Sequence, residues 1–174
     1  VDPATRLTHA VAAFRIADAH QGLATAVRRY KYGGQAHLAR DLARLLVPLL
    51  GRRAREVDLV VPVPSTRTSL RTRGFHPVLE MLREVRRWGV ALPLAPRLLG
   101  PADERPPQAS LPLAERRRLS SRAFRVTRPD AVLGQRVLLV DDVLTTGATI
   151  RACCRALLRA GARRVDVVTL ARTP

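Results

Sequence analysis

The fold of this chain is decided by residues 137–149, which read VLLVDDVLTTGAT. The apolar run in residues 136–140 predicts a buried strand, and residues 141–149 predict a turn. A helix is expected over residues 150–160, and residues 165–170 predict a second strand. Strand, helix and strand together predict one βαβ unit of a parallel sheet, with a ligand crevice at the carboxyl end of the first strand.

The turn carries residue types that suit a phosphorylated sugar. A helix N-terminus offers unpaired N–H groups to an anion, and Gly147 lets the backbone approach it closely. Three threonines add hydroxyl donors: Thr145, Thr146 and Thr149. Asp141 and Asp142 can accept hydrogen bonds from the two hydroxyls of a ribose diol. The segment predicts a monophosphate cradle, and it contains neither GxxxxGK[ST] nor GxGxxG.

Apolar periodicity predicts further elements upstream. The first helix presents Leu23, Val27 and Tyr30, and the second presents Leu38, Leu42, Leu45, Leu46 and Leu49. Pro48 is expected to kink or end the second helix. Residues 57–63 predict a buried strand, and residues 65–75 predict a basic loop. Pro77 suits the first turn of a third helix that presents Val78, Leu82 and Val85 and closes at Trp88. The proline-rich residues 95–111 predict a long mobile loop, with a short helix after it over residues 112–119.

Composition favours a globular domain with an anionic partner. The 174 residues suit one domain, and 47% of them are apolar, which is enough for a packed core. Lys plus Arg number 31 against 14 Asp plus Glu, a net charge of +17, and Lys31 is the only lysine. Such an excess indicates a nucleic acid or a small polyphosphate as partner, without choosing between them.

Several classes of protein are excluded or disfavoured. No uncharged stretch exceeds nine residues, so membrane insertion is not expected, and the first ten residues lack the apolar core of a signal peptide. Cys153 and Cys154 are adjacent, which allows neither a disulfide framework nor a CxxC zinc site, and we expect them to pack as small apolar groups. The histidines lack zinc-enzyme spacing. A cytoplasmic location is the default expectation.

Residues 137–149 resemble, at every position, the phosphoribosyl pyrophosphate (PRPP) signature of type I phosphoribosyltransferases. The resemblance implies an α/β fold, a parallel twisted sheet flanked by helices with a small N-terminal hood. It also implies that Asp141 and Asp142 hold the ribose diol, and that the turn wraps the 5-phosphate through Thr145, Thr146, Gly147, Ala148 and Thr149. Mg²⁺ is then expected as cofactor, held mainly by the substrate, with Asp141 or Asp142 as a protein ligand.

The rest of the chain resembles the ComF branch of that superfamily, the competence-associated phosphoribosyltransferase-like proteins. KYGG at residues 31–34, VPVP at 61–64 and RGF at 73–75 carry this resemblance, together with Gln108, Leu111, Glu115, Arg116 and Ala123-Phe124. It implies a pyrophosphate loop with Ser65, Thr66, Arg67, Arg71 and Arg73, and a mobile loop over residues 97–118. Arginines suit the charge of a pyrophosphate leaving group, so Arg116 and Lys31 join the expected catalytic residues. His76-Pro77 and Leu119 depart from the family pattern and remove polar side chains.

Three functions follow as hypotheses. The first is Mg²⁺-dependent transfer of phosphoribosyl from PRPP to an unidentified nitrogen nucleophile. The second is a competence module that binds single-stranded DNA during DNA uptake, and the third is a PRPP-responsive regulator without catalysis.

One domain is expected, with hood and helices in residues 1–56 and the PRPP-binding core in 57–174. Lys31 has a structural alternative as a helix-end cation. The stripe of Arg151, Arg155 and Arg159 is either a solvated face or a nucleic-acid surface.

Overall fold

The computed structural model contains both helices and strands and describes residues 7–15, 21–102 and 123–172. The strands are β1 (Leu7–Arg15), β2 (Leu59–Pro62), β3 (Leu99–Pro101), β4 (Phe124–Val126), β5 (Arg136–Leu144) and β6 (Arg164–Arg172). The α-helices are α1 (Gln21–Tyr32), α2 (Ala39–Arg53), α3 (Arg67–Arg73), α4 (Pro77–Arg87) and α6 (Ala148–Arg159). Short 3₁₀ helices are η1 (Ala36–Leu38), η2 (Ala54–Glu56) and η3 (Pro129–Ala131).

Four parallel strands form the main sheet in the order β1-β6-β5-β2. The predicted βαβ unit is present as β5, α6 and β6, with Val137 opposite Val165 in the ladder. The sequence did not predict β1, which pairs with β6 from Leu7 to Arg15. Residues 1–56 therefore contribute a strand to the sheet as well as helices.

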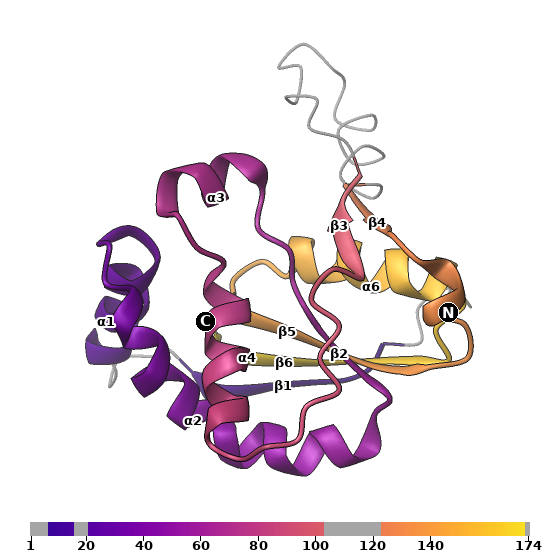
Figure 1. Ribbon diagram of the computed structural model, residues 1–174, viewed down its shortest axis with the longest axis horizontal. Helices are drawn as coiled ribbons and strands as arrows, with labels where there is room; N and C mark the ends of the chain where they lie inside the picture. The colour runs from indigo at the N-terminus through magenta and orange to yellow at the C-terminus, as the bar shows by residue number, and fades with distance from the viewer. Residues whose placement is uncertain (1–6, 16–20, 103–122, 173–174) are drawn as a thin grey trace.

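Helices cover both faces of the sheet, as Figure 1 shows with α6 on one side and α2 and α4 on the other. Side chains alternate between the two faces because successive residues of a strand point in opposite directions. Val60, Leu138, Val140, Val168 and Leu170 pack toward α1, α2 and α4. Val61, Val137, Leu139, Val165 and Val167 pack toward α6. This arrangement confirms the expected α/β fold with a parallel sheet flanked by helices.

The predicted end of the first strand of the βαβ unit was wrong. β5 runs on to Leu144, so Asp141 and Asp142 lie within the strand and not in a turn after it. The ladder continues because β6 is equally long, with Asp141 opposite Thr169 and Leu144 opposite Arg172. The helix starts at Ala148, two residues earlier than predicted.

The segment predicted as a basic loop contains helix α3. Thr66 caps its start, because the Thr66 side chain accepts a hydrogen bond from the Ser69 amide at 3.1 Å. Gly74 ends it with a φ of 76°, a left-handed conformation that favours glycine. A polar seven-residue helix has no apolar stripe, so periodicity could not reveal it.

Helix α2 differs from the prediction in its length and its buried face. It passes through Pro48 and ends at Arg53. Leu42 and Leu46 are buried as predicted, but Leu45 is exposed. The buried face is completed by Ala39, Ala43 and Leu50.

The predicted long loop over residues 95–111 contains β3, which pairs antiparallel with β4. The remainder of that loop and the helix predicted over 112–119 lie outside the described residues. Helix α4 agrees with the prediction, with Pro77 in its first turn, Val78, Leu82 and Val85 buried, and Trp88 at its end. In the described part of the chain, no helix has the length and apolar character to span a membrane.

Candidate functional site

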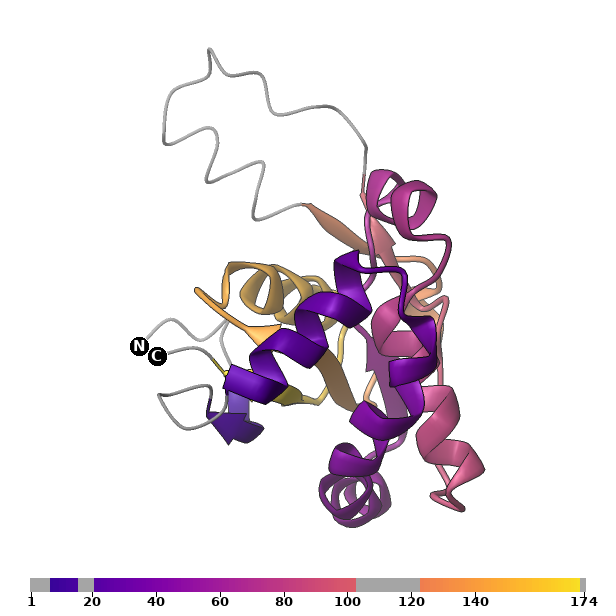
Figure 2. The same ribbon diagram turned by 90° about the vertical axis from the view of Figure 1, so that its left-hand side faces the viewer.

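The predicted site residues gather where the parallel strands end. The amide of Val63, just after β2, donates a hydrogen bond to the carbonyl of Val140 in β5 at 2.8 Å. The chain leaving β2 toward Ser65 therefore runs beside the Asp141-Asp142 pair. Helices α1 and α3 lie at this edge of the sheet in Figure 1, and Figure 2 looks onto it with α1 in front.

Two carboxylates occupy the end of β5. Asp141 Oδ1 accepts a hydrogen bond from the Asp142 amide at 2.9 Å, and Asp142 Oδ1 accepts one from the Val143 amide at 2.7 Å. The Lys31 ammonium of α1 lies 2.8 Å from Asp142 Oδ1. Asp142 is only 4% exposed, so this ion pair compensates a carboxylate that has lost most of its water.

The neighbouring carboxylate has a different electrostatic environment. Burial raises the pKa of Asp141 to about 7, and the negative charge of Asp142 adds to the shift. Lys31 opposes the shift, as does the hydrogen bond from the Asp142 amide. The pair therefore holds less negative charge at neutral pH than two ordinary carboxylates would. A cationic ligand or a bound metal ion would favour ionisation of both.

The turn after β5 leads directly into helix α6. Thr145, Thr146, Ala148 and Thr149 are exposed, and the Thr146 hydroxyl accepts a hydrogen bond from the Ala148 amide at 3.4 Å. Gly147 precedes the helix with a φ of 72° and offers no side chain to the amides of the first turn. Those amides and the surrounding hydroxyls form an edge that can receive an anion.

Arg151, which the sequence places on a basic stripe with Arg155 and Arg159, lies beside this turn. A Cβ atom added at Gly147 would lie 2.9 Å from Arg151 Nη1, so this guanidinium group lies over the turn. Arg151 is exposed and belongs to the first turns of α6. The spacing of four residues from Gly147 is the signal that could have found it, because residues i and i+4 of a helix are neighbours.

The KYGG segment brings α1 and α3 together at the site. Lys31 contacts Asp142, and the guanidinium carbon of Arg73 lies 4.7 Å from the centre of the Tyr32 ring. The Gly33 amide bonds to the Arg29 carbonyl, and a Cβ at Gly33 would lie 2.8 Å from that oxygen. Lys31 is thus both a cation in the last turn of a helix and the ion-pair partner of Asp142.

The remaining residues of the expected pyrophosphate loop lie on or next to α3. Ser65 precedes the helix and Thr66 caps it, while Arg67 and Arg71 are exposed one turn apart. Arg73 is half-buried against Tyr32. The loop therefore contains a short cationic helix that begins five residues after the end of β2.

His76 keeps a polar role although it departs from the family pattern. The His76 side chain caps α4, because its Nδ1 lies 3.3 Å from the Leu79 amide. Its Nε2 lies 3.3 Å from the Ser65 amide. A neutral imidazole has a single acceptor nitrogen, so one of these hydrogen bonds forms in each tautomer. Burial lowers the pKa of His76, which favours the neutral ring. His76 therefore ties the Ser65 loop to the start of α4.

Arg116 and the two cysteines are not among the site residues that the structure describes. Arg116 and most of the expected mobile loop lie outside the described residues. Cys153 and Cys154 are buried on α6, which confirms packing as their role. Burial raises the pKa of both thiols, so they stay protonated at neutral pH.

Comparisons with known proteins agree with this geometry. Residues 102–174 match the phosphoribosyl transferase domain family. The chain is 32% identical over 166 residues to the DNA utilization protein YhgH of Salmonella typhi, covering 91% of this chain and 70% of the relative. It is 28% identical over 156 residues to competence protein F of Haemophilus influenzae, and this match covers 86% of this chain and 68% of the relative.

A solved structure has the same fold. The glutamine PRPP amidotransferase from B. subtilis superposes with a TM-score of 0.52 at 23% identity, over 82% of this chain. The match spans only 30% of the amidotransferase, so the likeness concerns one part of that protein. The sequence motifs, the edge of the sheet where they meet and these relatives lead to one conclusion: the chain belongs to the ComF family of competence-associated proteins within the type I phosphoribosyltransferase superfamily.

Proposed function

We propose that this protein binds PRPP at the carboxyl edge of its sheet and transfers the phosphoribosyl group to a nitrogen nucleophile, releasing pyrophosphate. The observation that supports this most strongly is the continuous segment from Asp141 to Thr149, in which two carboxylates in a strand precede an anion-receiving helix start. In this proposal the turn and Arg151 bind the 5-phosphate, and Asp141 and Asp142 accept hydrogen bonds from the ribose diol.

The charges around the site suit the reaction. Breaking the glycosidic bond makes the ribose cationic and the pyrophosphate more anionic. Carboxylates on β5 can stabilise the ribose, while Lys31 and the arginines of α3 can stabilise the leaving group. Lys31 has three donor hydrogens, so it can turn from Asp142 toward a phosphate once the diol occupies that carboxylate.

Mg²⁺ is the cofactor that this donor set fits. The described residues contain no group of three or more His, Cys, Asp or Glu side chains that could cage a metal ion. Mg²⁺ is commonly held by one or two carboxylates together with substrate phosphates, and Asp141 and Asp142 are such a pair. When bound, the ion would neutralise charge on the pyrophosphate.

The proposal also places the protein in the cytoplasm, where reduced cysteines such as Cys153 and Cys154 are ordinary.

Release of pyrophosphate from PRPP tests this function directly. The protein is incubated with PRPP, Mg²⁺ and a panel of nucleobases and amines, and we expect acceptor-dependent release that is lost in Asp141→Asn with Asp142→Asn. Asp41→Asn with Asp130→Asn removes two exposed carboxylates elsewhere and serves as the matched control. PRPP binding without release for any acceptor would overturn the catalytic part and favour the PRPP-responsive regulator.

The second candidate function is binding of single-stranded DNA during DNA uptake. The relatives named as DNA utilization protein and competence protein favour it, together with the net charge of +17. Binding that depends on phosphate contacts weakens with salt, with a log-log slope near −0.7 per phosphate contacted for a single strand. Failure to bind an oligonucleotide even at low salt would contradict this candidate.

A further inference from the structure

The only tryptophan of the chain is exposed on the surface and contacts two arginines. Trp88 follows the last turn of α4 and is 43% exposed. The guanidinium carbons of Arg40 and Arg44, one turn apart on α2, lie 5.6 and 5.7 Å from the centre of its ring. An exposed aromatic ring among arginines is a combination that can stack a base and hold a phosphate.

The two arginines begin a basic stripe along α2. Positions i, i+4, i+12 and i+15 fall on one side of a helix and are occupied by Arg40, Arg44, Arg52 and Arg55, the last just beyond the helix in η2. All four are exposed, and they extend over about 20 Å. None takes part in an ion pair among the described residues, whereas Arg53, Arg83 and Arg87 each pair with a glutamate. Four unneutralised cations on one face favour an anionic partner.

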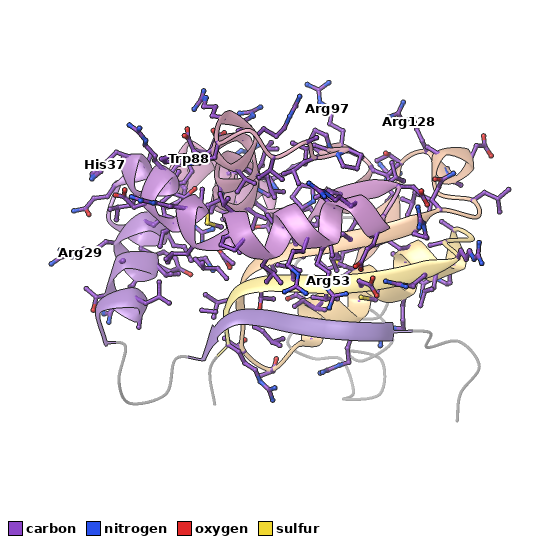
Figure 3. All side chains as sticks on the ribbon, turned by 90° about the horizontal axis from the view of Figure 1, so that it is seen from below. Arg29, His37, Arg53, Trp88, Arg97 and Arg128 are labelled. Atoms are coloured by element: carbon purple, nitrogen blue, oxygen red, sulfur yellow. The ribbon has the colours of Figure 1, made fainter. Side chains whose placement is uncertain are left out.

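Two hollows border this stripe. The first has a volume of about 430 Å³ and is lined by Arg40, Glu84, Arg87 and Trp88. The second, of about 540 Å³, is lined by Val47, Pro48, Gly51, Arg52, Arg55, Glu56 and Val90. Figure 3 shows the molecule from below, the side on which α2 lies, with Trp88 and Arg53 labelled. Space for flat groups therefore lies beside the line of arginines.

We propose that this α2–Trp88 surface, comprising Arg40, Arg44, Arg52, Arg55 and Trp88, binds single-stranded nucleic acid. A base stacks on the open part of the Trp88 ring, and the phosphate backbone follows the arginines. An unpaired base is required for stacking, which favours a single strand over a duplex. The inference rests on the second candidate function and assigns it a surface separate from the PRPP site. Tyr30 of α1 contacts the Pro77 end of α4, while Trp88 lies at the opposite end, about 16 Å along the helix axis.

The test uses Trp88 itself as the probe, because the chain has no other tryptophan. Labelled oligothymidylate and oligouridylate of about 20 nucleotides, and a duplex of the same length, are titrated against the full chain. We expect quenching of Trp88 fluorescence by the single strands and weaker binding of the duplex. Both single strands carry the proposed chemistry, and a preference between them identifies the nucleic acid as DNA or RNA.

Substitutions locate the binding. Trp88→Ala is expected to weaken binding about tenfold or more, and Trp88→Phe to retain part of the affinity. Arg40→Ala with Arg44→Ala should weaken binding and lower the salt slope by about 1.4, that is two phosphate contacts. Arg97→Ala with Arg128→Ala removes the same charge from exposed positions labelled away from Trp88 in Figure 3. Calorimetry with PRPP should give the same affinity for the α2–Trp88 variants as for the wild type.

The outcomes separate this inference from the function on which it rests. If the two arginine pairs weaken binding equally and Trp88→Ala leaves it unchanged, the strand binds elsewhere. In that case the surface is wrong while the DNA-binding function stands. If the wild-type protein binds no single strand at low salt, both are overturned.

Discussion

Asp142 is a carboxylate that the fold buries against the Lys31 ammonium. Its side chain is 6% exposed, and the Lys31 ammonium at 2.8 Å is 21% exposed on its own side. Removing one partner of a buried pair leaves an uncompensated charge, which costs more than the pair contributes. The only lysine of an arginine-rich chain thus occupies a position where a compact ammonium group reaches the proposed diol site.

Substitution of Lys31 tests whether this pair stabilises the fold. Lys31→Met should lower the free energy of unfolding by about 1–2 kcal/mol, a value reduced for the partial exposure of the lysine. Asp142→Asn in the Lys31→Met background should restore part of the loss, since the unpaired charge is then gone. Urea denaturation of the four proteins gives the coupling energy. Additive effects of the two substitutions would show that the pair has no energetic coupling.

Asp141 makes stability depend on pH. Its pKa rises from 3.8 to about 7 on folding, so the folded chain holds a proton that the unfolded chain releases above pH 4. The stability from this group is complete below pH 4 and is lost as pH rises through about 7. Asp141→Asn should therefore equal the wild type in stability below pH 4 and become progressively more stable than it between pH 4 and pH 8, by on the order of 2–4 kcal/mol at pH 8. Thermal denaturation across this range checks it, and a difference that does not change with pH would contradict the assignment.

At the scale of elements, the β5–α6 connection holds the turn in one conformation. Gly147 has a φ of 72°, and a side chain there would meet both Arg151 and Leu144. The turn is therefore shaped by a backbone that only glycine adopts readily and by a guanidinium group that closes over it. Both features belong to the short stretch in which the proposed 5-phosphate site is built.

A comparison of Gly147→Ala with Gly134→Ala distinguishes the effect of backbone strain on stability from the effect of the turn on PRPP binding. Gly134 has a similar φ of 74°, and nothing lies within 4 Å of a Cβ added to it. Both variants should lose about 1 kcal/mol of stability through the left-handed backbone. Only Gly147→Ala should also weaken PRPP binding, because it displaces Arg151. Equal PRPP affinities of the two variants, measured by calorimetry, would show that the turn is not the phosphate site.

The elements that the sequence predicted are those with strong local signals. β5, α6 and β6 follow from apolar runs and one glycine, and α4 follows from Pro77 and a clear apolar stripe. Helix α3 was not predicted, because the features that stabilise it are the Thr66 cap and Gly74 and not an apolar periodicity. Strand β1 forms through pairing with β6, which is more than a hundred residues away in the sequence. No local sequence pattern predicts such a pairing. The contact between Arg151 and Gly147 likewise depends on side-chain placement.

At the scale of the whole molecule, part of the excess positive charge of +17 lies on two surfaces with different chemistry. Lys31, Arg73 and Arg151 lie at the carboxyl edge of the sheet, beside the proposed PRPP site. The stripe of arginines on α2 lies on the outer side of the helical layer that covers one face of the sheet. This separation allows a small ligand and a nucleic-acid strand to bind the same chain without competing for one site.

The central claim is that the carboxylates of β5 bind the ribose of PRPP, and calorimetry tests it most directly. PRPP is titrated with Mg²⁺ into the wild type, into Asp141→Asn with Asp142→Asn, and into the control Asp41→Asn with Asp130→Asn. We predict binding by the wild type and by the control, and no detectable binding by the Asp141–Asp142 variant, with all three folded by circular dichroism. An unchanged PRPP affinity in the folded Asp141–Asp142 variant would contradict the claim.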